Sequence, residues 1–236
     1  MTRLGATIIS SKGEACLLLT CHLQLFFRPQ SYLLALLVLL LFLYGYIDLS
    51  VNMADVENNR LNFRPPSTSV DDKSVDFATP QASSLHGKWY VTHSTLPMWK
   101  SNRNVTITYT PLPNNVEVLD DLVEYQPLKS NKHKKVEGYD TPDAKVCAAY
   151  SWRGKGLLKI ASSHWQVLGY GGEDDGWCVT YFQKTLFTPA GIDIYARRKG
   201  GLSAELLERI RNEIKNIKDH SVERLAELVF PIHHNW

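Results

Sequence analysis

Two polar residues at opposite ends of a strand-rich region, His93 and Asp193, are the pair with the clearest potential for chemistry. Strand side chains alternate between faces, so His93 shares a face with Trp89, and Asp193 shares one with Arg197. If both faces point into one closed barrel, whose first and last strands are neighbours, the imidazole and the carboxyl would meet in an apolar interior. Such a buried pair could act as general acid and base on a bound molecule.

Two simpler explanations compete with this catalytic interpretation. Either residue could be a structural polar group with satisfied hydrogen bonds, or a β-bulge could reverse the face of one strand. The sequence contains no Gly-rich phosphate loop, zinc-spaced Cys/His set or nucleophile elbow. His233 and His234 have no nearby third ligand, and the acidic run 173–175 precedes Gly176 as in a hairpin turn. We therefore expect no bound metal and no cofactor. The absence of an established catalytic motif favours a protein that is not an enzyme.

The elements that would position these residues are short strands. Between residues 88 and 197, apolar and polar residues alternate in runs bounded by Gly, Pro, Asn and Asp, with a long loop predicted at 129–143. Short turns between eight strands favour an all-β, antiparallel up-and-down barrel, which leaves no edge unpaired. The expected strands are Lys88–Ser94, Asn104–Thr110, Val116–Tyr125, Lys145–Trp152, Leu157–Ala161, His164–Gly169, Trp177–Leu186 and Gly191–Arg197.

Two short motifs lie at the two ends of this β region. Gly87 and Trp89 form a Gly-x-Trp at the first strand, and Arg197 ends the last strand, with Arg198 as its rival if the register is one residue off. This arrangement resembles the lipocalin family of the calycin superfamily over residues 85–218. The resemblance implies that the Arg197 guanidinium lies over the Trp89 indole and seals the closed end of a barrel, a cation–π contact.

Aromatic residues are frequent in the expected strands, and about half of them should face inward. An eight-stranded barrel has room for one small ligand. We therefore expect binding and sequestration or transport of a small hydrophobic molecule of the lipid, terpenoid or pigment class. The alternative is a lipocalin-fold isomerase or cyclase acting on a bound apolar intermediate, and a third interpretation is an interaction module with a filled barrel. The residues predicted to line the pocket are Val91, Tyr109, Trp152, Tyr181 and Tyr195.

An amphipathic α-helix is expected directly after the last strand, with Ser203 as its N-cap. Its single apolar stripe predicts docking on the outside of the barrel. Lipocalins usually return to a ninth strand afterwards, whereas the C-terminal tail, residues 219–236, places apolar residues at helical spacing before a proline. The stripe consists of Leu206, Ile210, Ile214 and Ile217.

The sequence before the barrel falls into two parts. Within residues 1–52, the uncharged apolar run 32–47 is a little shorter than the roughly 20 residues that span a bilayer. Basic residues before it and acidic residues after it predict a single-pass membrane anchor with a lumenal or extracellular barrel. The alternatives are a cleaved signal peptide or translation from Met53, which would give a cytoplasmic protein. Residues 53–84 show neither strand nor helix periodicity and are predicted to be a disordered linker.

Composition narrows the classes of partner. The net charge of +2 argues against a nucleic-acid partner, and 44% hydrophobic with 21% charged residues is typical of a globular chain. Four cysteines are too few for a disulfide scaffold. Asn104, in Asn-Val-Thr, is a glycosylation acceptor by sequence, and matters only if the barrel is lumenal.

Overall fold

The computed structural model describes residues 36, 39–42, 61–67, 77–186 and 188–236. The chain divides into two units, Met1–Asn58 and Asn59–Trp236. In the first unit the described residues are helical. Among the described residues, no helix is long and apolar enough to cross a bilayer. Most of the apolar run 32–47 lies outside the described residues, so the membrane anchor stays a prediction.

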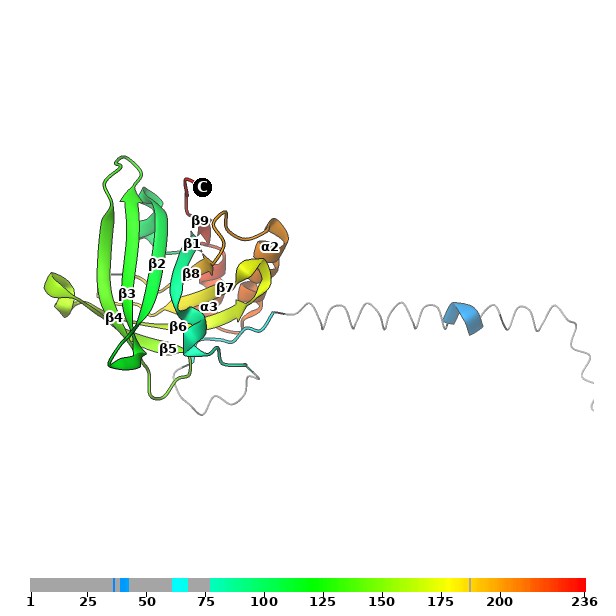
Figure 1. Cartoon of the computed structure of the whole chain (residues 1–236). Helices are drawn as coiled ribbons and strands as arrows, with labels where there is room; N and C mark the ends of the chain where they lie inside the picture. Colours follow the sequence, from blue (N-terminus) through cyan, green and yellow to red (C-terminus); the bar gives the residue numbers. More distant parts are fainter. Residues whose placement is uncertain (1–35, 37–38, 43–60, 68–76, 187) are drawn as a thin grey trace, which may run out of the picture. The chain divides into compact units, whose positions relative to one another are not determined.

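The second unit is a closed antiparallel barrel of eight strands, so the predicted fold class is confirmed (Figure 1). Each strand pairs with the next along the chain, and the first strand closes the barrel by pairing with both the second and the eighth. A two-residue ninth strand pairs with the end of the first. The strands are β1 (Gly87–Ser94), β2 (Asn102–Leu112), β3 (Asn115–Pro127), β4 (Lys134–Pro142), β5 (Ala149–Gly154), β6 (Ser162–Gly171), β7 (Trp177–Phe182), β8 (Gly191–Ala196) and β9 (Phe230–Pro231).

Two of the individual strand predictions were wrong. β4 occupies most of the segment predicted as a long loop, and it pairs with β3 and β5 along its length. Its inward positions include Gly138 and Asp140, so the strand lacks the apolar alternation that reveals a strand in a sequence. The predicted strand Leu157–Ala161 is instead the 3₁₀ helix η3 (Gly156–Ile160). Leu157 is 99% exposed there, so this apolar run has no sheet to pack against.

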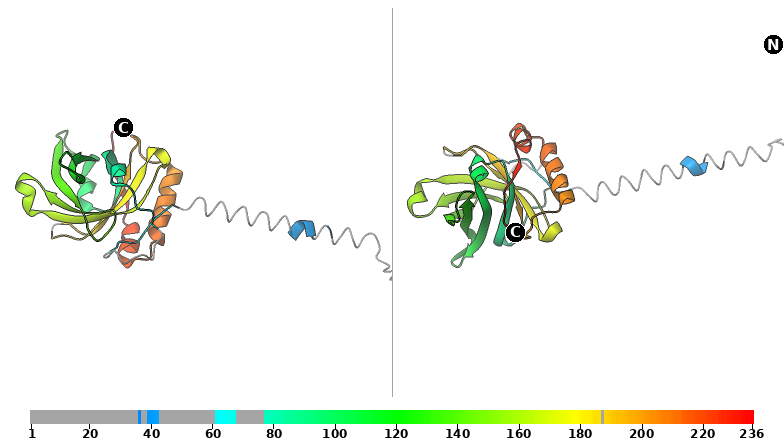
Figure 2. Two further views of the ribbon diagram at one scale, coloured as in Figure 1. Left: turned by 60° about the horizontal axis from the view of Figure 1, so that its bottom comes forward. Right: turned by 90° about the horizontal axis from the view of Figure 1, so that it is seen from above.

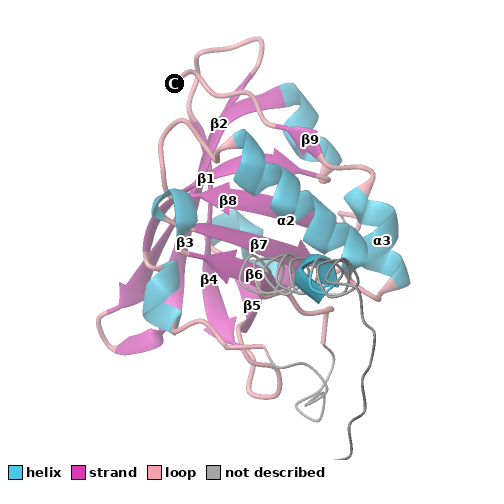
Figure 3. Ribbon diagram, turned by 90° about the vertical axis from the view of Figure 1, so that its right-hand side faces the viewer, coloured by secondary structure: helices cyan, strands magenta, loops and turns pink. Residues whose placement is uncertain are grey.

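The barrel has one apolar core inside and another on its outer face. The outer core joins β6, β7 and β8 to the helices α2 (Ala204–Asn216) and α3 (His220–Ala226), which lie against the same side of the barrel (Figures 2 and 3). Helix α2 begins at the predicted cap, where the backbone N–H of Leu206 donates to Ser203 Oγ over 3.3 Å. The C-terminal tail contains both the helix α3, which its helical spacing predicted, and the ninth strand, which is usual in lipocalins.

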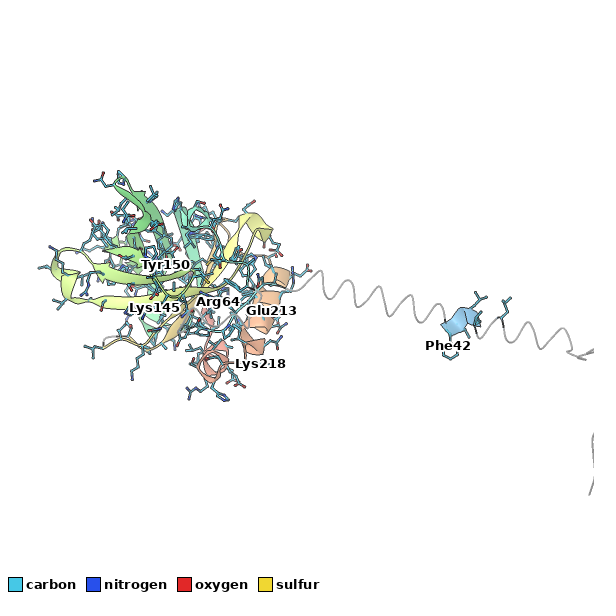
Figure 4. The ribbon with its side chains drawn as sticks, turned by 90° about the horizontal axis from the view of Figure 1, so that it is seen from below. Phe42, Arg64, Lys145, Tyr150, Glu213 and Lys218 are labelled. Carbon is cyan, nitrogen blue, oxygen red and sulfur yellow. The ribbon has the colours of Figure 1, made fainter. Side chains whose placement is uncertain are left out.

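Part of the predicted linker is an ordered arm against the barrel. Residues 61–67 lie along β6, where Phe63 forms a bridge with Gly169. The Arg64 side chain, labelled in Figure 4, donates from Nε to the Val167 carbonyl at 2.8 Å and from Nη2 to the Cys147 carbonyl at 2.7 Å. These few contacts leave no periodic pattern in the sequence, which is why the arm was not predicted.

Candidate functional site

One end of the barrel is closed by Trp89 and Arg197. The guanidinium carbon of Arg197 lies 3.5 Å from the centroid of the Trp89 ring. The same guanidinium donates to the carbonyls of Lys88 at 3.0 Å and Ser84 at 2.6 Å, which ties the last strand to the chain entering the first. The Trp89 indole N–H donates to the Leu85 carbonyl at 2.8 Å. The Trp89 ring, the Arg197 guanidinium and the 3₁₀ helix η1 (Ala82–Leu85), which precedes β1, therefore form one plug.

The neighbours of this plug identify the register of the last strand. Gly87 has a φ of +91°, and a Cβ there would lie 3.3 Å from Arg197 Nη1, so a side chain would strain the backbone beside the guanidinium. Arg198 turns away and pairs with Asp174 at 3.3 Å. The structure thus places Arg197, and not Arg198, over the tryptophan.

At the opposite end the barrel holds a cavity of about 200 Å³. The loops between β1 and β2, between β5 and β6, and between β7 and β8 contribute to its wall. The first of these loops contains the 3₁₀ helix η2 (Pro97–Ser101), which places Met98 and Trp99 against the cavity. Most of the remaining wall comes from inward-facing positions of the strands. A small ligand entering here would be enclosed by aliphatic and aromatic side chains.

The structure separates the five predicted pocket residues into three groups. Tyr109 and Trp152 line the cavity. Val91 and Tyr195 face the interior but are packed in its core and do not line the cavity. Tyr181 was assigned wrongly, because it belongs to the outer core beneath the helices. Both faces of β7 are apolar, so the sequence pattern could not say which face points inward.

The predicted His93–Asp193 pair is not formed. The pairing of β1 with β8 shifts register between Val91 and His93, so that His93 stands opposite Ile194 and Ser94 stands opposite Asp193. This is the β-bulge that competed with the catalytic interpretation. Asp193 faces inward as expected, and it accepts a hydrogen bond from the Ser94 hydroxyl instead of an imidazole.

His93 lies on the outer side of β1, where its Nδ1 is 3.1 Å from the Thr92 hydroxyl. Burial, together with the nearby charges of Arg211 and His234, lowers the pKa of His93 to about 4. The imidazole is therefore neutral at physiological pH and has no access to the barrel interior. It has no place in a reaction inside the barrel.

Stacked aromatic rings separate the closed end from the cavity. The Trp165 ring lies 5.7 Å from Tyr109 and 4.6 Å from Tyr150, both at shallow interplanar angles. The Trp165 indole N–H donates to Asp140 Oδ1 over 2.7 Å. The indole of Trp152 on β5 fills the space above Gly138 on β4. A Cβ at Gly138 would lie 2.1 Å from the indole nitrogen of Trp152. The glycine therefore allows this ring to line the cavity.

Three carboxyl groups are buried within the barrel: Asp121 on β3, Asp140 on β4 and Asp193 on β8. Burial raises the pKa of Asp193 to about 7, although the interactions of its carboxyl with the Ser94 hydroxyl and the Trp99 indole lower that pKa. Burial likewise raises the pKa of Asp140 to about 7, against the hydrogen bond from the Trp165 indole.

Asp121 is the most perturbed of the three. Burial raises its pKa well above the usual range, and the neighbouring Asp140 and Asp120 raise it further. Sequence reasoning missed Asp121, although a signal exists: it occupies the inward position between Leu119 and Val123 in an otherwise apolar alternation. A carboxyl on the apolar face of a strand is a candidate functional group.

The glycosylation candidate Asn104 sits at a bulge in β2, with a φ of 54°. Its side-chain nitrogen donates to Gln126 Oε1 at 2.7 Å, and its side-chain oxygen accepts from the backbone N–H of Asn235 at 2.7 Å. Asn104 therefore joins β2 to β3 and to the C-terminal tail. A glycan on this nitrogen would have to displace the Gln126 contact, and glycosylation stays a prediction from the sequence.

No protein-family model and no curated protein matches the sequence. The structure is similar to apocrustacyanin C1, with a TM-score of 0.53 and 14% identity over 74% of this chain and 91% of that one. It is also similar to apocrustacyanin C2, with a TM-score of 0.52 and 15% identity over the same shares of the two chains. At this level of identity the similarity concerns the fold. Together with the Trp89–Arg197 closure and the outer helix, it identifies the chain as a protein with a lipocalin-like barrel fold.

Proposed function

We propose that the barrel binds one small hydrophobic molecule and sequesters or transports it. The observation that carries this proposal is the cavity at the open end of the barrel, lined chiefly by aromatic and aliphatic side chains and closed at the other end by the Trp89–Arg197 plug. Ligand burial there would contribute roughly 25 cal/mol for each Å² of apolar surface removed from water. Molecules of the lipid, terpenoid or pigment class have surfaces of this kind.

A titration with the uncharged fluorophore N-phenyl-1-naphthylamine tests the proposal. We expect saturable quenching of tryptophan emission in the purified full-length protein, because Trp99, Trp152 and Trp165 line the cavity. Val123→Phe should weaken the binding by filling the cavity. Val116→Phe is the matched control, since Val116 is 64% exposed at the start of β3, at the closed end of the barrel. The proposal fails if the protein does not bind the probe, or if both variants bind it like the wild type.

A second candidate function is that of an isomerase or cyclase on a bound apolar intermediate. The His93–Asp193 pair no longer supports it, but a carboxyl with a pKa of about 7 in contact with the cavity, Asp193, is suited to proton transfer. Incubation of wild type and Asp193→Asn with an extract of the native host, followed by mass spectrometry, would distinguish enzyme from binder. An enzyme would give a product that disappears with Asp193→Asn, whereas a binder would give none.

A further inference from the structure

The charged residues that line the cavity are all acidic. Asp121 and Asp193 both face the cavity from opposite parts of the barrel, with only 6% and 1% of their surfaces exposed. Among the described residues that line the cavity, none is a lysine, an arginine or a histidine. The interior therefore presents negative or neutral carboxyl groups to a ligand and offers no positive partner.

Asp121 is the less satisfied of these two carboxyls. Its Oδ1 is fully buried and accepts no hydrogen bond from the described part of the chain. The adjacent Asp120 faces outward and pairs with Lys155 Nζ at 2.5 Å. A buried carboxyl oxygen without a donor is costly, and a ligand that supplies the donor would remove that cost.

The rest of the wall suits a cation as well as an apolar body. Five aromatic side chains line the same cavity: Trp99, Tyr109, Trp152, Trp165 and Phe182. The faces of aromatic rings attract cations, and a desolvated site strengthens that attraction. Aromatic rings, two carboxyls and no base are complementary to an ammonium group on a hydrophobic skeleton. The described residues of the same wall offer a carboxylate no positive partner.

We propose that the cavity selects an apolar amine, whose ammonium group pairs with Asp121 while its hydrophobic part lies among the aromatic rings. This inference rests on the proposed function and names the class of ligand for the same cavity. It predicts that a cationic ligand binds more tightly than a neutral or an acidic ligand of the same size.

Three water-soluble compounds with one skeleton test it: 3-phenylpropylamine, 3-phenylpropan-1-ol and 3-phenylpropanoic acid. Their affinities for the full-length protein, held in nanodiscs of zwitterionic lipid, are measured by calorimetry at neutral pH. We expect the amine to bind at least about tenfold more tightly than the alcohol, and the acid to bind most weakly. This comparison uses the wild type alone, so it does not depend on any variant folding.

Two variants assign the preference to the carboxyl. Asp121→Asn keeps the shape of the side chain and should reduce the amine affinity at least about tenfold while leaving the alcohol affinity unchanged. Glu124→Gln, on the same strand but facing outward, should change neither. If the alcohol binds as tightly as the amine, the inference is overturned and the proposed function stands. If none of the three compounds binds although N-phenyl-1-naphthylamine does, the inference alone is overturned, and if that probe does not bind either, the proposed function fails with it.

An independent observation concerns the outer surface at the mouth of the cavity. The loops that follow β1, β3, β5 and β7 lie at this end by the topology of the barrel. They carry strongly exposed apolar side chains, with Leu157 99%, Leu186 96% and Ile160 83% exposed. Monomeric soluble proteins rarely gather such residues without a partner.

The charged residues of the same four loops are all basic. Residues 97–101, 128–133, 155–161 and 183–190 contain no Asp or Glu. The loops at the closed end are different, since 172–176 alone contains Glu173, Asp174 and Asp175. Apolar tips surrounded by cations suit the surface of an anionic bilayer, where side chains enter the headgroup region and lysines meet the lipid charge. The lysines of the mouth loops are Lys100, Lys129, Lys132, Lys159 and Lys184, together with Lys155, which is paired with Asp120.

We infer that the mouth of the barrel docks on an anionic membrane surface. Hydrogen exchange of the full-length chain, with vesicles of phosphatidylcholine alone or with about 30% phosphatidylserine, tests this. We expect protection of residues 156–160 and 183–186 with the anionic vesicles, and none at residues 172–176. A chain held to the vesicles by another segment would still report which end of the barrel touches lipid.

A double variant and a matched control complete the test. Leu157→Ser combined with Ile160→Ser should abolish the protection, and Val116→Ser, at an exposed apolar residue of the other end, should retain it. Equal protection with both kinds of vesicle, protection at the closed end, or no protection at all would overturn the docking surface.

Discussion

Arg197 joins three parts of the molecule, because its guanidinium covers the Trp89 ring and donates to two backbone carbonyls. We expect Trp89→Ala to lower the free energy of unfolding by roughly 3–5 kcal/mol, as for a buried aromatic residue. Arg197→Ala should cost less, because part of the guanidinium is near solvent. Arg198→Ala should cost about 0–1 kcal/mol, since its pair with Asp174 is exposed. Urea unfolding measures all three, and a larger loss for Arg198→Ala would contradict the observed register.

Asp193 should make stability depend on pH. Its folded-state pKa is about 7 against an ordinary value of 3.8, so the folded chain keeps a proton that the unfolded chain has released. Its contribution is complete below about pH 4 and is lost as the pH rises through 7. His93 and His234 have lowered pKa values and act in the opposite direction below about pH 6.5.

The comparison of wild type with Asp193→Asn isolates the effect of this carboxyl. We expect the difference in free energy of unfolding between the two proteins to change by an amount on the order of 4 kcal/mol between pH 4 and 8, with the wild type relatively more stable in acid. Ser94, Trp99 and Tyr195 surround the carboxyl, and we expect them to keep their places in the variant because asparagine has the same shape as aspartate. A difference that does not vary with pH would show that Asp193 ionises normally.

At the level of elements, the ordered arm depends on one glycine in β6. A Cβ at Gly169 would lie 2.6 Å from the Phe63 ring, so Gly169→Val should displace the arm. We expect faster hydrogen exchange at Arg64, whose N–H donates to the Leu168 carbonyl at 2.8 Å, and a loss of stability of about 1–3 kcal/mol. Gly172→Val is the control, because a Cβ at Gly172 would meet nothing within 4 Å. Unchanged exchange at Arg64 in Gly169→Val would show that the arm tolerates a side chain there.

Elements also differ in how well the sequence revealed them. β1, β2 and α2 carry strong periodic patterns or a clear cap, and the structure has them close to their expected positions. β4 carries glycine and aspartate on its inward face, and its strand conformation comes from hydrogen bonds to β3 and β5, which no local pattern contains.

At the level of the whole molecule, the membrane anchor at 32–47 remains the main untested prediction. We expect the full-length chain to pellet with membranes and to resist carbonate extraction, because the run is uncharged and apolar and only a little shorter than the roughly 20 residues that span a bilayer. A chain beginning at Met53 should stay in the supernatant unless anionic vesicles are present. Mapping the N-terminus of the native protein to Met53 would contradict the anchor.

The sequence by itself determined the class of the fold and its two ends. Strand alternation, turn residues, the Gly87-x-Trp89 and Arg197 motifs and the cap of α2 are local features, and each depends on residues close together in the chain. They suffice for a closed antiparallel barrel with a helix outside, although the expected count of eight strands included 157–161 in place of β4.

Only the tertiary structure decided what faces the cavity. The bulge after Val91 turns His93 outward, the register of β7 places Tyr181 beneath the helices, and Asp121 and Asp193 line the same cavity. These outcomes depend on the pairing of strands that are far apart in the sequence, and a shift of one residue exchanges the two faces of a strand.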